Sequence, residues 1–433
     1  MEIYEKISAL AEDMTAELIA TRRDFHKYAE SGWTEMRTSS LIARRLTDLG
    51  YEVLTGEAVC DRDARMGVPE QAVLDKAYER AIAQGGDPEF LPATRDGMTG
   101  VIGILRCGEG PTMALRFDID ALGVMESEDA DHIPAREGFA SVNPGVMHAC
   151  GHDGHATTGL GVAKVLMEIK DRLHGTVKLI FQPAEEGVRG AKSIVTKGHL
   201  DKVDYFLGTH ITGSKNGQVY LIPGSYGSLA TCKYDAYFTG KSAHAGASPH
   251  TGHSAMQAAA AAVLHLYAIP RHGGGASRIN VGTLTAGTGR NVIADRAKLE
   301  LEVRGANTEI NNYMCENAER VLTSCAQMYG CQVTWKLAGA ADSMVSDVDY
   351  AERLAEYAKA AGLAVGATTI PSFGSEDVSY MVNRVQEQGG KASFARLMTK
   401  AYAPAHNVKY NFDEAVLPFG VKAVSTAVYS LLK

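Results

Sequence analysis

The sequence predicts an α/β protein that carries a second, α+β domain as an insertion. Short apolar runs alternate with helical stretches in the first half of the chain, and this pattern returns near the C-terminus. Between them lies a block of alternating strands and two long helices. We expect one domain from residues 1–229 and 340–433, with a mostly parallel or mixed sheet flanked by helices, and an inserted domain at residues 230–339.

The N-terminal part of the first domain is expected to be helical. An apolar stripe predicts a helix over residues 3–30, and a second predicted helix over residues 38–49 ends at Gly50, a normal C-cap. Residues 61–98 are charged and contain one predicted exposed helix at residues 71–83. We interpret this segment as an insertion beside the core that shapes an entrance.

Buried strands are expected in both domains. In the first domain they are residues 101–105, 113–117, 177–181 and 205–208, with helices at 157–169, at 350–361 and after Asp413. In the inserted domain, strands are expected at 234–238, 280–284, 298–303 and 332–336, and helices at 253–267 and 310–328. Four strands and two helices suit a compact, ferredoxin-like α+β layer.

Composition excludes several classes of function. The chain has 433 residues, 22% charged residues and a net charge of −8, and it has no basic run, so we expect no nucleic-acid partner. Residues 1–20 mix charged and apolar side chains, which fits neither a signal peptide nor a membrane span. Seven scattered cysteines suit a reducing compartment, so we expect a cytoplasmic protein with no membrane association.

One eight-residue stretch concentrates reactive side chains. Residues 148–155 contain a thiol, three imidazoles and a carboxylate. In an extended backbone Cys150 and His152 share a face, so they can bind one metal ion together. Asp153 is a candidate N-cap for the following helix. The alternative is a buried cysteine with polar neighbours that cap the helix.

Three further features carry candidate metal chemistry. Glu185 and Glu186 directly follow the strand predicted at residues 177–181, and neighbours in an extended stretch point in opposite directions. One carboxylate can therefore bind a metal while the other takes the proton of an activated water. The alternative is a solvated Glu-Glu turn. His210 at a strand end and His406 near the C-terminus would each be ordinary histidines if taken alone.

Taken together, the motifs resemble the aminoacylase/carboxypeptidase clan of metallopeptidases, in the branch of N-acyl amino acid amidohydrolases. The resemblance runs nearly end to end, and its matching segments are Arg116–Leu122, Met147–Asp153, Gln182–Glu186, Phe238–Ala245 and Gly374–Asp377. Within that branch, Tyr28–Trp33 and the insertion at 61–98 are most similar to hydrolases of p-aminobenzoyl-glutamate.

The resemblance implies a site for two divalent metal ions, Mn²⁺ or Zn²⁺. The implied ligands are Cys150, His152, Glu186, His210 and His406. Glu185 would be the general base, and Asp118 could orient a ligand imidazole or be a plain strand-end carboxylate. The implied reaction is hydrolysis of the amide bond of an N-acyl amino acid, above all an N-aroyl one, that has a free carboxylate. p-Aminobenzoyl-glutamate is the favoured substrate, and hippurate-like or other N-acyl amino acids are the alternative.

The resemblance also gives the inserted domain a role in dimerisation and closure. His244 would reach into the partner subunit's site and stabilise the oxyanion, while Asn291 and Arg304 match positions that bind the substrate carboxylate. Arginine suits that task because its donors meet a carboxylate in a bidentate fashion. We expect a homodimer, or a heterodimer with a similar subunit. The rival hypothesis, a non-catalytic partner subunit, is disfavoured because every implied ligand and the base are present.

Overall fold

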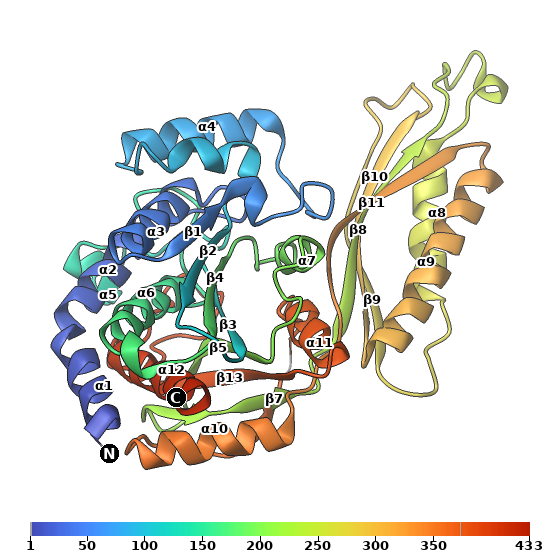
Figure 1. Cartoon of the computed structure of the whole chain (residues 1–433). Coiled ribbons are helices and arrows are strands. Elements are labelled where there is room, and N and C mark those ends of the chain that lie inside the picture. Colours follow the sequence, from blue (N-terminus) through green and yellow to red (C-terminus); the bar gives the residue numbers. More distant parts are fainter. Residues whose placement is uncertain (1, 373) are drawn as a thin grey trace.

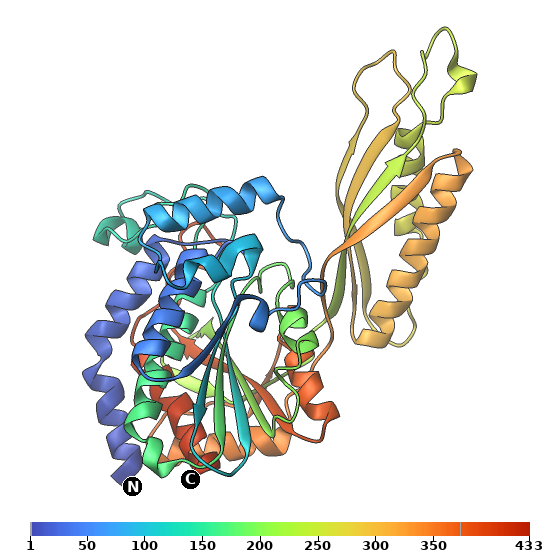
Figure 2. The same cartoon turned by 45° about the horizontal axis from the view of Figure 1, so that its top comes forward.

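The computed structural model describes residues 2–372 and 374–433. It has a main domain built around a large sheet and an inserted domain that projects from it (Figure 1). Figure 2 shows that the two domains meet at one end of the inserted domain's sheet, so the opposite end extends away from the main domain.

The main domain is organised around one mixed sheet of seven strands in the order β1-β2-β4-β3-β5-β13-β6. Strands β4, β3, β5 and β13 are parallel to their neighbours within this central group, while the three outer pairings, β1 with β2, β2 with β4 and β6 with β13, are antiparallel. The strands are β1 (Glu52–Thr55), β2 (Val101–Arg106), β3 (Thr112–Asp118), β4 (Thr176–Gln182), β5 (Tyr205–Gly213), β6 (Tyr220–Ile222) and β13 (Lys391–Thr399). A separate parallel pair joins β7 (Gly224–Tyr226) to β12 (Thr369–Pro371).

Helices cover both faces of this sheet, and each face has its own apolar core. The core on one face includes residues of α1 (Glu2–Asp13), α2 (Thr15–Lys27), α3 (Met36–Asp48), α6 (His152–Glu168), α10 (Val348–Ala360) and α12 (Val416–Leu432). The core on the other face includes residues of α7 (Ala191–Thr196) and α11 (Ser379–Glu387). The short helix α5 (Ile133–Glu137) lies before the stretch at 148–155. The predicted fold class, a mixed sheet flanked by helices, is confirmed.

Two local predictions in the main domain were wrong. The single helix expected over residues 3–30 is broken into α1 and α2, and the Thr15 hydroxyl donates to the Glu12 carbonyl at 2.7 Å, which competes with continuous helix. Strand β13 was missed because Ser393 and Arg396 interrupt its apolar run. Both polar side chains are buried with partners: the Ser393 hydroxyl donates to the Pro223 carbonyl at 2.6 Å, and Arg396 is ion-paired.

The charged segment at residues 61–98 carries α4 (Gln71–Ala83), as predicted. One face of this helix is not exposed, because Leu74, Ala77 and Ala81 are buried against Met36 of α3. None of the described helices is both long and apolar enough to cross a bilayer.

The inserted domain is a four-stranded antiparallel sheet with two helices on one face, in ferredoxin-like order. The strand order is β11-β8-β10-β9, and the elements are β8 (Ala230–Thr239), α8 (Ala255–Tyr267), β9 (Ser277–Ala286), β10 (Arg296–Gly305), α9 (Thr308–Met328) and β11 (Gln332–Ala341). Along β8, Tyr234, Ala236 and Phe238 are buried in the core with the helices. Figures 1 and 2 both place α8 and α9 on the side of the sheet away from the main domain.

Candidate metal centre

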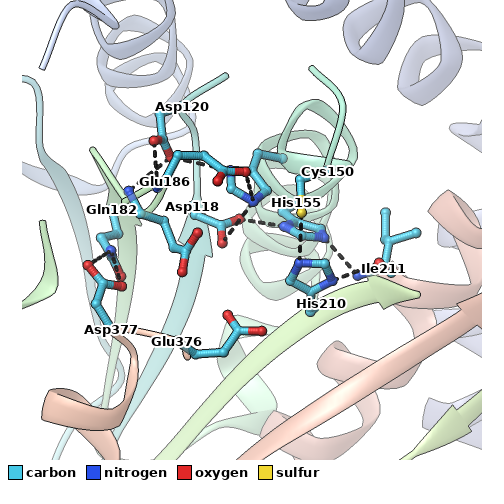
Figure 3. Close-up of polar contacts among 12 residues, drawn as sticks. Asp118, Asp120, Cys150, His155, Gln182, Glu186, His210, Ile211, Glu376 and Asp377 are labelled. Atoms are coloured by element: carbon cyan, nitrogen blue, oxygen red, sulfur yellow. Dashed lines mark hydrogen bonds and ion pairs between the residues drawn. The ribbon is translucent and has the colours of Figure 1, made fainter. Parts of the chain in front are cut away.

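Polar side chains gather where the central parallel strands of the main sheet end. Asp118 is the last residue of β3, Glu185 follows β4, and His210 lies in the second half of β5. Parallel strands bring their carboxyl ends to one edge of the sheet, which is where α/β proteins place their sites. Helix α6 begins at the same edge, and Figure 3 shows these side chains pointing toward one another.

The turn into α6 brings Cys150 and His152 together. Gly151 lies between them with a φ of 91°, in the left-handed region that favours glycine. The expected extended backbone is therefore wrong, and a loop-to-helix turn makes the two side chains converge instead. The predicted N-cap is also wrong: α6 begins at His152, and the Asp153 carboxylate is fully buried in an ion pair with Arg22 at 2.8 Å.

His210 presents one ring nitrogen to Cys150. Its Nδ1–H donates to the Ile211 carbonyl at 2.7 Å, which leaves the Nε2 lone pair 3.5 Å from the Cys150 Sγ. Burial lowers the pKa of His210 well below its ordinary value, so the ring is neutral. A neutral imidazole with its second nitrogen fixed by a carbonyl is the form that binds metals.

The two glutamates lie in a tight turn after β4. Ala184 and Val188 on either side adopt left-handed φ values of 51° and 60°. The backbone N–H groups of Glu185 and Glu186 donate to the two carboxylate oxygens of Asp120, at 3.0 and 2.9 Å. The extended backbone expected here is wrong, and both carboxylates point into the same cluster. The solvated-turn alternative is excluded, because Glu185 is 7% exposed.

All five implied ligands come together in the structure. Within 4.8 Å, ligand atoms of Cys150, His152 and His210 form one group, and those of Cys150, Glu186 and His406 form another. Cys150 belongs to both groups. The Nε2 atom of His406 is 3.7 Å from the Glu186 carboxylate, and the His406 N–H donates to the Ala149 carbonyl at 2.7 Å, which ties this C-terminal loop to the α6 turn.

The electrostatics of this cluster suit divalent cations. Burial and nearby carboxylates raise the pKa of the Cys150 thiol to about 12, and burial raises the pKa of Glu186 to about 7. His152 Nε2 and Glu186 Oε1 are buried and have no hydrogen-bond partner among the described residues, and the two atoms are 3.9 Å apart. A thiol, imidazoles and carboxylates with too little positive charge between them fit borderline metal ions.

Asp118 and Asp120 support the imidazoles. His155 accepts the Ile211 N–H at Nε2 and therefore donates from Nδ1 to Asp118. Asp118 is also 3.5 Å from His152 Nε2, while Asp120 lies 3.3 Å from His152 Nδ1. Asp118 thus contacts an implied ligand, as the sequence suggested.

Sequence reasoning missed three residues that hold the glutamate turn. Asp120 was quoted in a motif but given no role. The Glu35 carboxylate accepts the Ala184 N–H at 2.8 Å, and Asp377 accepts the N–H groups of the residues that open α7. The Gly374–Asp377 motif indicated the last of these, but no sequence signal pointed to Glu35.

The implied residues of the inserted domain are divided between its two ends. Arg304 is at the end near the main domain, opposite Thr231 on β8, and it forms a bidentate ion pair with Glu302 at 3.0 and 3.1 Å. His244 and Asn291 are exposed near the remote end, roughly 30 Å along the ten residues of β8 at about 3.3 Å per residue. The structure does not bring them to the metal cluster.

The model of one protein family, described as peptidase family M20/M25/M40, matches residues 114–430. The chain belongs to this family. As an M20/M25/M40 family member it is a metal-dependent hydrolase of amide bonds, which confirms the resemblance found in the sequence.

Three proteins similar to this family member cover nearly the whole chain. Indole-3-acetyl-aspartic acid hydrolase of Enterobacter agglomerans is 47% identical over 94% of this chain and 94% of its own. One subunit of the p-aminobenzoyl-glutamate hydrolase of Escherichia coli is 45% identical over 97% of both chains. The crystal structure of aminobenzoyl-glutamate utilization protein from Klebsiella pneumoniae has a TM-score of 0.84 and 38% identity, covering 97% of both chains.

Proposed function

We propose that this protein hydrolyses the amide bond between an aromatic acyl group and an acidic amino acid, with p-aminobenzoyl-glutamate as the substrate. The convergence of five potential ligands beside Glu185 is the observation that carries this proposal. The names of the similar proteins support it, since one acts on an indole-3-acetyl conjugate of aspartate and another on a p-aminobenzoyl conjugate of glutamate. Indole-3-acetyl-aspartate is therefore the second candidate substrate.

The proposed ligands hold two Mn²⁺ or Zn²⁺ ions. Cys150 belongs to both ligand groups, so we assign it to both ions, with His152 and His210 on one and Glu186 and His406 on the other. When bound, the ions would polarise the amide carbonyl and acidify a water molecule.

The chain's own residues would then move the proton and stabilise charge. Glu185 accepts a proton from water as the water oxygen adds to the amide carbon, and it returns a proton to the leaving nitrogen. The Nδ1 atom of His244 accepts two backbone N–H groups, at 3.0 and 3.1 Å, so its Nε2 carries the proton of the neutral ring. That Nε2–H is the proposed donor to the oxyanion.

The remote position of His244 implies that catalysis needs a second chain or a closing movement. We propose that residues 230–339 act as dimerisation surface and lid, with hinges at 225–229 and 339–342. Asn291 and Arg304 would bind the α-carboxylate, and Arg304 would share Glu302 or leave it. One relative is named as part of a hydrolase with more than one kind of chain, which supports a heterodimer with a similar chain as the alternative to a homodimer. Seven free cysteines support a cytoplasmic location.

Turnover by the chain alone tests this function. The purified protein, reconstituted with Mn²⁺ or Zn²⁺, is assayed with p-aminobenzoyl-glutamate, indole-3-acetyl-aspartate, hippurate and N-acetyl amino acids. We expect p-aminobenzoyl-glutamate to give the highest kcat/KM. Metal-loaded protein that hydrolyses none of these amides would contradict the proposal, and it would favour the non-catalytic partner hypothesis if a similar chain restored activity.

A further inference from the structure

The helix-free face of the inserted sheet carries an unpaired cation close to the main domain. Lys233 is the fourth residue of β8 and lies on the face opposite Tyr234, which is buried under the helices. Its ammonium group has no hydrogen bond or ion pair with any residue that the structure describes. Glu302, directly opposite on β10, is already engaged by Arg304.

The register of the sheet directs Lys233 toward the turn that carries the twin glutamates. Lys233 is paired with Gly339 of β11, and directly opposed residues in antiparallel strands point to the same face. A Cβ added to Gly339 would lie 2.1 Å from the Gly187 carbonyl oxygen. The next residue, Ala340, donates its N–H to the Val188 carbonyl at 2.9 Å. Lys233 therefore faces the segment that directly follows Glu186.

The charge of Lys233 is felt at the metal cluster. Burial lowers the pKa of Lys233, while Glu302 and Glu185 act in the opposite direction. Burial also lowers the pKa of His406, and the charges of His152 and Lys233 lower it further. A half-buried cation without a carboxylate partner is costly unless a ligand supplies one.

We propose that the ammonium group of Lys233 binds the side-chain carboxylate of the acidic amino acid in the substrate. This rests on the proposed function and names the residue that selects glutamate or aspartate over neutral amino acids. Arg304 is the diagonal neighbour of Lys233 on the same face, so the two cations are placed to meet the two carboxylates of one dicarboxylic amino acid.

The relatives support the choice of this part of the substrate. The two curated relatives described above are named for conjugates with different acyl groups, but both conjugates contain an acidic amino acid. Arg189 is a weaker candidate, because two backbone carbonyls already hold its guanidinium: Glu186 O at 2.8 Å and Gly67 O at 3.1 Å.

A selectivity measurement with a neutral isostere tests the role of Lys233. The kcat/KM values for p-aminobenzoyl-glutamate and p-aminobenzoyl-glutamine are compared in wild type, Lys233→Met and Lys233→Arg. Loss of a charge-assisted contact should lower the glutamate-to-glutamine ratio about 10- to 100-fold in Lys233→Met, mainly through KM, and Lys233→Arg should restore part of it. Lys298→Met removes a cation from the same sheet face at the position opposite Tyr237 and is the matched control.

The outcomes separate this inference from the function on which it rests. An equal loss for both substrates, or an unchanged ratio, overturns the role of Lys233. If the wild type hydrolyses neither substrate, the function fails, and calorimetric Kd values for the two compounds on metal-loaded Glu185→Gln still test the inference. A glutamate preference in binding that Lys233→Met removes supports the inference, and its absence overturns it.

Discussion

The replacement Asp120→Asn should uncouple the glutamate turn from the metal cluster. The Asp120 carboxylate is almost completely buried, and its two oxygens accept the N–H groups of Glu185 and Glu186 at 3.0 and 2.9 Å. One oxygen also faces His152 Nδ1 at 3.3 Å. An asparagine has one acceptor oxygen, so its amide N–H₂ must face a second donor in place of an acceptor.

The expected magnitude follows from these contacts. At least one charge-assisted hydrogen bond is lost, which is worth about 1.5–3 kcal/mol, or roughly a 10- to 100-fold change in an equilibrium or rate. Because Glu185 and Glu186 lie on the same turn, the loss should affect both kcat and the affinity for the metal.

Steady-state kinetics and metal titration of the purified variant measure both quantities. Asp129→Asn is the control, since Asp129 is an exposed carboxylate paired with Lys409 at 2.7 Å. Thermal unfolding shows whether the variant is folded. An Asp120→Asn protein whose kcat and metal affinity stay within about twofold of wild type would refute the positioning role, since one such bond is worth more than that.

Three more predictions follow from the site and its surroundings. Glu185→Gln should keep the metal content and lower kcat by about two to four powers of ten, and loss of metal would mean that the two glutamates have exchanged roles. Mixed Glu185→Gln and His244→Ala subunits should recover part of the activity if His244 acts in trans; no recovery despite confirmed exchange would place it in its own chain or outside catalysis. Arg22→Ala leaves the Asp153 carboxylate buried without its ion pair, so the free energy of unfolding should fall by about 3–5 kcal/mol in urea denaturation, and a change below about 1 kcal/mol would contradict this.

The sequence predicted the ligand set because residue type and strand position carry that information. Cys150, His210 and Glu186 are metal-binding residue types at strand ends or at a helix start, and they converge as expected. The reason given for their convergence was wrong, since it assumed extended backbone where Gly151 and Ala184 take left-handed conformations. Local turn geometry depends on tertiary hydrogen bonds that a linear pattern does not show.

Other features were beyond the sequence for a related reason. The support from Asp120 and Glu35 comes from segments far apart in the chain, so their roles depend on how the sheet edge assembles. Strand β13 is buried despite Arg396, because that side chain finds Glu376 at 3.2 Å. The position of His244 depends on a partner chain or on a domain movement, and neither follows from composition or periodicity.

The assignment of two ions to five side chains is tested most directly by a crystal structure grown with Mn²⁺ or Zn²⁺, using the anomalous signal of the metal. We expect two anomalous peaks, each about 2.0–2.5 Å from its ligands, with Cys150 Sγ bound to both ions. His152 and His210 should bind one ion, and Glu186 and His406 the other. A single peak, or two peaks that leave His210 or His406 unbound, would contradict the account.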